Sequence, residues 1–115
     1  MNFKHIYKIC TYAEWSQAKK NGKFTGSKKD ILDGFIHLSN KDQLSGTFKK
    51  YYLNQKDLIL LKINALNLRS LVYEQSSDGN IFPHLYEPLD LSNVIEEYKI
   101  NLNENGTHNI PEDLN

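Results

Sequence analysis

Hydrophobic and polar residues alternate along this chain with two different periods, and each period predicts a different element. A period of two predicts an opening strand over residues 3–10. A helix is expected over residues 12–21, because residues 11–14 (T-Y-A-E) have capping-box spacing and Gly22 can end the helix. Residues 23–34 are polar and contain two glycines, so we expect a loop or a short irregular element there.

The rest of the pattern adds mainly strands. Residues 35–39 predict a short strand, and a second helix follows, with apolar residues at i, i+4 and i+7 from Leu44. Residues 57–63 contain four consecutive apolar residues at 58–61, so both faces of a strand would be apolar there, which favours a central strand. Further strands are expected at 71–74, 81–86 and 94–100. The pattern therefore predicts an α+β fold with a split or strongly curved, mostly antiparallel sheet and two main helices.

The last residues differ in composition from the others. Residues 101–115 contain five asparagines and three acidic residues, with no basic residue and one proline. Such a segment buries little apolar surface. We expect one domain over residues 1–100 and a loosely ordered tail over residues 101–115.

Charge and cysteine content narrow the function classes. The 115 residues have no formal net charge, but residues 1–69 carry 13 basic and 5 acidic groups, and residues 70–115 carry one basic and nine acidic groups. A protein that binds bulk nucleic acid over a uniformly basic surface is therefore disfavoured, whereas a small anionic ligand is compatible. There is no apolar stretch long enough to span a membrane. The single Cys10 has no internal disulfide partner, and we expect a cytoplasmic protein.

Two short segments share a design that carries the candidate chemistry. On one face each presents an aromatic ring, an imidazole and a hydroxyl: Phe35, His37 and Ser39 in the first, and Phe82, His84 and Tyr86 in the second. Imidazoles and hydroxyls suit the hydroxyl groups of a sugar or a nucleotide. The alternative is structural: a strand histidine is usually hydrogen-bonded within the fold, and Ser39 could cap the next helix. The pattern does not tell whether the two strands are neighbours.

Other side chains are weaker candidates. Gln43 and Thr47 lie four apart on one helix stripe, and Glu74 stands at a strand end as a possible acid or base. Each of the three is also compatible with simple exposure to solvent. The Gly- and Lys-rich residues 22–29 could touch a phosphate or form a solvated turn. No nucleotide-binding glycine motif is present, and the four histidines lack metal-ligand spacing, so no metal is expected.

The motifs D-G-F-I-H-L-S at residues 33–39 and F-P-H-L-Y at residues 82–86 carry a resemblance. With Trp15 and other single positions, they resemble a bacterial family of small proteins known as domain-of-unknown-function family 952, over residues 3 to about 98. Glu87 departs from the pattern, because the family usually has glycine there.

That family in turn resembles the ADP-ribosyltransferase-like superfamily, including RNA 2′-phosphotransferases. The resemblance implies a nucleotide cleft, with NAD as a candidate substrate. By position, Lys8 stands where those enzymes have an early His or Arg, His37 and Ser39 match the middle motif, and Glu74 is a candidate for the late glutamate. The catalytic residues expected are His37, Glu74 and His84, and the ligand-binding residues expected are Tyr7, Lys8, Ser39, Gln43, Thr47 and Tyr86.

Two hypotheses of different classes remain. The first is a transferase or glycohydrolase that acts at the ribose of NAD or of a related nucleotide. The second is a non-catalytic module that keeps the cleft for a nucleotide-like ligand, or only the fold for a protein partner. The phosphotransferases grip phosphate through several arginines, whereas this chain has only Arg69, which disfavours that particular activity.

Overall fold

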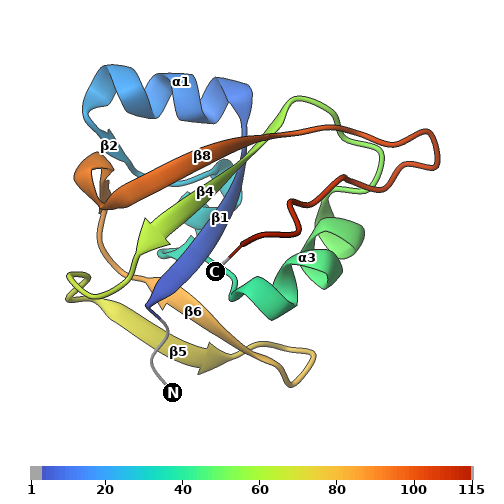
Figure 1. Ribbon diagram of the computed structural model, residues 1–115. Coiled ribbons are helices and arrows are strands. Elements are labelled where there is room, and N and C mark those ends of the chain that lie inside the picture. The colour runs from blue at the N-terminus through green and yellow to red at the C-terminus, as the bar shows by residue number, and fades with distance from the viewer. Residues whose placement is uncertain (1–3, 115) are drawn as a thin grey trace.

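The strands of the computed structural model, which describes residues 4–114, form three antiparallel sheets (Figure 1). The first has the order β1-β4-β8, with bounds His5–Thr11, Leu58–Asn64 and Val94–Ile100. The second has the order β3-β6-β5, with bounds Ile36–His37, Ile81–Leu85 and Leu71–Gln75. A third pairs β2 (Lys23–Phe24) with β7 (Leu89–Asp90). The predicted α+β class and the antiparallel pairing are confirmed.

Strand β4 lies in the middle of the first sheet, as its apolar sequence predicts. On one face of β4, Ile59 and Leu61 pack with Trp15 in a first core. On the other face, Leu60 packs with Phe48 in a second core. Helices therefore cover both faces of this sheet. Full burial of each such side chain contributes about 1.5–3 kcal/mol of hydrophobic free energy.

The helices begin and end where local chemistry dictates. Helix α1 (Tyr12–Asn21) starts with the predicted capping box, in which Thr11 and Glu14 bond each other's backbone, and it ends at Gly22 in a left-handed conformation. A 3₁₀ turn η1 (Lys41–Gln43) leads into α3 (Leu44–Tyr51). A second 3₁₀ turn, η2 (Leu91–Asn93), precedes β8.

Residues 23–34 are more regular than expected. They contain strand β2 and a six-residue helix, α2 (Lys28–Asp33), which starts with a second capping box between Ser27 and Asp30. The prediction of a loop or irregular element is therefore corrected. The S-x-x-D spacing was the available signal, but a helix this short leaves no repeating apolar stripe from which to predict it.

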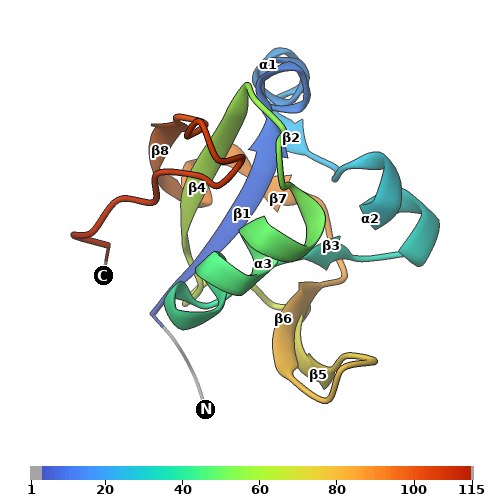
Figure 2. The same ribbon diagram turned by 90° about the vertical axis from the view of Figure 1, so that its right-hand side faces the viewer.

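The first two sheets meet at one isolated bridge. The backbone of Tyr7 in β1 donates to the carbonyl of Ser39 at 2.8 Å, and the amide of Ser39 donates back at 2.9 Å. Figure 2 shows the consequence: α3 crosses in front of β1, and the β5–β6 hairpin extends below it as a separate wall. Ser39 does not cap the helical segment, which starts after Asn40.

The C-terminal segment 101–114 turns back after β8 (Figure 1). It contacts the domain through Leu114 in the second core and through His108. The His108 ring lies tilted against Phe48 with centroids 5.0 Å apart, and its Nε2 lies 2.7 Å from the carbonyl of Gln55. The amide of Asn54 donates to the carbonyl of Gly106 at 2.9 Å.

Between residues 4 and 114, none of the helices has the length and apolar character needed to cross a membrane.

Candidate functional site

A cleft of about 540 Å³ opens between α2, β3, α3 and the turn that joins β5 to β6. Ligand sites in proteins typically have volumes of roughly 300–1,000 Å³, so the cleft is large enough for a nucleotide-sized molecule. Six of the nine residues singled out in the sequence line it: Lys8, His37, Ser39, Gln43, Thr47 and His84. Tyr7, Glu74 and Tyr86 do not line the cleft.

His37 and His84 are direct neighbours in the second sheet, a point that the sequence left open. Strands β3 and β6 pair antiparallel with His37 opposite His84, and their ring centroids lie 5.6 Å apart. Phe35 stacks on the His84 ring with centroids 4.1 Å apart and tilts against His37 at 4.6 Å. Both imidazoles are thus held by aromatic packing at the wall of the cleft.

Two carboxylates flank the His37 ring. Its Nδ1 lies 2.6 Å from Oδ1 of Asp30, and its Nε2 lies 3.0 Å from Oδ2 of Asp33. A neutral imidazole has one N–H and can donate to one of them, whereas the protonated ring donates to both. The His37 ring therefore lies between two carboxylates, a buried one on its Nδ1 side and an exposed one on its Nε2 side.

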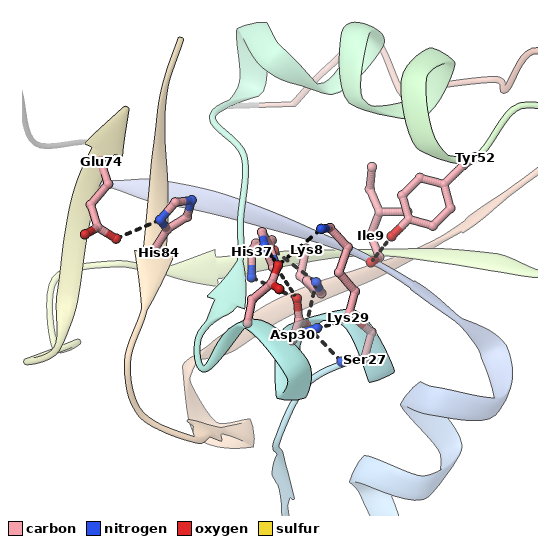
Figure 3. Close-up of polar contacts among 10 residues, drawn as sticks. Lys8, Ile9, Ser27, Lys29, Asp30, His37, Tyr52, Glu74 and His84 are labelled. Carbon is pink, nitrogen blue, oxygen red and sulfur yellow. Dashed lines mark hydrogen bonds and ion pairs between the residues drawn. The ribbon is translucent and has the colours of Figure 1, made fainter. Parts of the chain in front are cut away.

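Asp30 is the buried centre of the site, with a side chain only 1% exposed. Its Oδ2 accepts from Nζ of Lys8 at 2.8 Å and from the amide of Ser27 at 2.8 Å, and its Oδ1 accepts from the amide of His37 at 3.1 Å (Figure 3). Burial alone would raise the pKa of this carboxyl. The hydrogen bond from His37 and the charge of Lys8 outweigh it and hold the Asp30 pKa well below its usual range.

Lys8 is as deeply buried as its partner. Its side chain is 3% exposed, and Nζ also donates to the carbonyl oxygen of His37 at 3.0 Å. The ammonium group is therefore committed to Asp30 and to β3. A ligand in the cleft meets it only as part of this buried ion pair.

His84 has a carboxylate partner of its own, on the side away from the His37 cluster (Figure 3). Its Nδ1 lies 2.8 Å from Oε1 of Glu74, and the Tyr86 hydroxyl donates to the same oxygen at 2.6 Å. The hydrogen bonds from Tyr86 and then His84 lower the pKa of Glu74, and the bond to Glu74 raises the pKa of the Tyr86 hydroxyl. Glu74 reaches the cleft only through the imidazole.

Ser39, Gln43 and Thr47 form a polar strip along the start of α3. Oγ of Ser39 lies 3.2 Å from Oγ1 of Thr47, which also donates to the carbonyl of Gln43 at 3.0 Å. The Gln43 amide donates to the carbonyl of Ile81 at 2.6 Å and so joins the helix to β6. The strip serves the fold and presents hydroxyl groups to the cleft at the same time.

Several lining residues were not singled out in the sequence. They include Asp30 from α2, Lys50 and Tyr51 from α3, and Asp78 from the β5–β6 hairpin, whereas Lys29 and Phe82, which also line the cleft, belong to segments considered above from the sequence. Lys50 and Asp78 form an ion pair at 3.5 Å across the cleft mouth, which joins the basic and acidic halves of the chain. Arg69 lies outside the lining. In the described part of the chain, no three His, Cys, Asp or Glu side chains are grouped as metal ligands.

Comparisons with known proteins agree on the fold but add no activity. The model of a family described as "Protein of unknown function (DUF952)" matches residues 9–97. Two crystal structures of protein CC0527 from Caulobacter crescentus, the second of them a double mutant, superpose with a TM-score of 0.87 at 43% and 42% identity, covering 91% of this chain and 93% of that one. The solution NMR structure of CC0527 has a TM-score of 0.82 at 43% identity and covers 91% of each chain. No curated protein matches the chain.

Proposed function

The chain belongs to the DUF952 family of proteins of unknown function, and we propose that its cleft binds NAD or a related nucleotide and acts at the ribose. The activity would be that of an ADP-ribosyl or related transferase, or of a glycohydrolase, on a fold similar to the ADP-ribosyltransferases. One observation carries the proposal: two imidazoles, paired in register on one cleft, each with Nδ1 on a carboxylate. Side chains fixed in this way are typical of sites that orient hydroxyl groups and move protons.

His84 would be the base in this reaction. In the neutral tautomer that donates Nδ1–H to Glu74, Nε2 is left as an acceptor at the cleft. Nε2 would take the proton of a water molecule or of an acceptor hydroxyl as the oxygen bonds to C1′ of the ribose. The C1′–N bond to nicotinamide breaks at the same time, and its electron pair neutralises the pyridinium nitrogen of the leaving group.

Glu74 would act through His84 instead of touching the ribosyl cation. The resemblance implies direct contact for the late glutamate of the superfamily, but Glu74 lies outside the cleft lining. Its role here would be to fix the tautomer of His84, with Tyr86 holding the carboxylate. His37, Ser39, Gln43 and Thr47 would contact the ligand, while Tyr7 and Lys8 would position the strand beneath it.

Ligand binding and turnover can be tested separately. Thermal unfolding is measured with millimolar NAD, ADP-ribose and 2′-phosphorylated RNA ends, and nicotinamide release is followed by NMR. A ligand at 100 times its Kd stabilises by about 2.7 kcal/mol, which raises Tm by roughly 10 °C for a domain of this size. We expect His84→Ala to abolish nicotinamide release while ADP-ribose still binds. His5 lies outside the cleft lining, so the control variant His5→Gln should keep both nicotinamide release and ADP-ribose binding. An absence of any ligand-induced shift would refute the proposal.

A second candidate is a binding module without catalysis. The commitment of Lys8 to Asp30 favours it, because the residue in the place of the early His or Arg of the enzymes is not free to orient a ribose. In that case NAD or ADP-ribose would raise Tm in the wild-type protein, but no nicotinamide would be released. The two measurements therefore separate the candidates.

A further inference from the structure

Asp33, the second carboxylate beside His37, also contacts Lys29. Oδ2 of Asp33 lies 3.0 Å from Nε2 of His37 and 3.1 Å from Nζ of Lys29, so a single oxygen lies between an imidazole and an ammonium group. Asp33 is the last residue of α2, where the partial negative charge of a helix C-terminus disfavours a carboxylate. The ammonium group of Lys29 offsets this effect.

The three groups differ in their exposure and in the number of their contacts. The His37 ring is anchored from behind, since its Nδ1 is held by the buried Asp30, which is in turn paired with Lys8. Asp33 and Lys29 are far more exposed, with side chains 38% and 61% accessible to solvent. Lys29 and His37 line the cleft, and Figure 3 shows the Lys29 side chain rising from α2 toward His37. Asp33 itself lies outside the lining.

We propose that Lys29 and His37 form an anion subsite at the edge of the cleft for a phosphate group, and that Asp33, which borders the cleft there, occupies this subsite as an internal competitor until a ligand displaces it. This inference rests on the proposed function, because Lys29 and His37 would be the residues that bind a phosphate group of the proposed nucleotide ligand. Ligand binding then requires the Asp33 carboxylate to rotate away from Nε2 of His37 and Nζ of Lys29.

The competition selects the chemical class of the ligand. A tethered carboxylate acts at an effective concentration on the order of millimolar, so a free monocarboxylate of the same charge gains little by replacing it. A phosphate ester carries about −1.5 to −2 charges at neutral pH and three acceptor oxygens, and it can engage the Lys29 ammonium and the His37 ring more strongly. The subsite therefore favours phosphate over carboxylate ligands.

The test uses inorganic phosphate, ADP-ribose and acetate with the full chain. Asp33→Asn removes the competitor and should tighten phosphate and ADP-ribose binding about three- to tenfold, the range expected for the loss of two exposed ion pairs. Asp78→Asn is the matched control, because Asp78 is equally exposed and also paired with a lysine, Lys50, at the cleft. It should change the affinity less than twofold. Lys29→Met should weaken phosphate binding.

A second measurement follows the ring directly. In ¹⁵N-detected NMR of the wild-type protein, phosphate should shift Nε2 of His37 and leave His108 unchanged, and acetate at the same concentration should shift neither. Equal tightening in Asp33→Asn and Asp78→Asn would refute the subsite, since only a general charge effect would remain. Tighter phosphate binding in Asp78→Asn alone would also refute the subsite, because the phosphate would then bind at Lys50 instead of Lys29.

The two proposals fail in different ways. If ADP-ribose raises the Tm of the wild-type protein and Asp33→Asn and Lys29→Met leave its affinity unchanged, the subsite is wrong and the nucleotide cleft stands. If phosphate shifts His37 and tightens in Asp33→Asn but neither NAD nor ADP-ribose binds, the subsite stands and the nucleotide proposal is wrong. If no ligand binds any variant, both are refuted.

Discussion

Replacing Asp30 by asparagine perturbs the site at its buried centre. The substitution keeps the size of the side chain but leaves the ammonium of Lys8, 3% exposed, without its counter-charge. Removing one partner of a buried ion pair typically costs about 3–5 kcal/mol, because the remaining charge stays buried. With about 2.1 cal/mol/K of unfolding entropy per residue, this corresponds to a Tm lower by roughly 12–20 °C.

The assay is a set of urea and thermal unfolding curves for four variants. Lys8→Met removes the other charge, and the double variant should be less destabilised than the sum of the two single variants, because no charge is then left unpaired. Asp33→Asn is the matched control, since Asp33 contacts the same imidazole from an exposed position and should cost less than about 1 kcal/mol. Strictly additive costs, or a cost below about 1 kcal/mol for Asp30→Asn, would refute the reasoning.

The stabilisation that Asp30 provides should depend on pH. The pKa of Asp30 is lowered in the folded state from its ordinary value of 3.8, so its contribution to stability is fully present above that value. The contribution is lost as the pH falls through the acid range below 3.8 and the folded carboxyl takes up a proton. The stability difference between wild type and Asp30→Asn should therefore shrink on acidification. A difference independent of pH would contradict the assignment.

Three further predictions concern the fold. Thr11→Ala removes the α1 cap and should lower the free energy of unfolding by about 1 kcal/mol in urea titrations, whereas an unchanged midpoint would contradict the capping box. Burial raises the pKa of the Cys10 thiol to about 12, so a thiol reagent should label it only as fast as the protein unfolds, and rapid labelling of the native protein would contradict this. Leu114→Ala should cost about 2 kcal/mol by thermal unfolding if the C-terminal segment packs into the second core, and a cost near zero would show that it does not.

Local signals were enough for much of the fold. Some elements depend only on residues close together in the sequence, so the sequence alone predicts them. They are the capping box before α1, strand β4 with apolar residues on both faces, and the turn between β5 and β6. Helix α2 was missed because six residues show no periodic stripe. The C-terminal segment is polar in composition, and its few buried contacts leave no periodic signal.

The site could be predicted only in part. The F-x-H pattern selected His37 and His84, but their adjacency is a property of strand pairing between residues far apart in the chain. Asp30 was missed for a different reason. A single carboxylate in a polar segment is normally exposed, and its burial depends on Lys8, which is 22 residues away in the sequence. Glu74 contacts His84 but lies outside the cleft lining, and its position in the sequence alone does not reveal this placement.

The bridge between Tyr7 and Ser39 has a consequence for how the molecule opens. Two backbone hydrogen bonds are the ladder contacts that join the sheet of β1 to the sheet of β3 and β6. Proteins open locally in cooperative units, and such a short seam is a natural boundary between two of them. The cleft lies across this boundary, since Lys8 belongs to one sheet and His84 to the other. A ligand that touches both sides would slow amide hydrogen exchange at the seam itself, at Tyr7 and Ser39, so that occupancy of the cleft could be measured without any knowledge of the reaction.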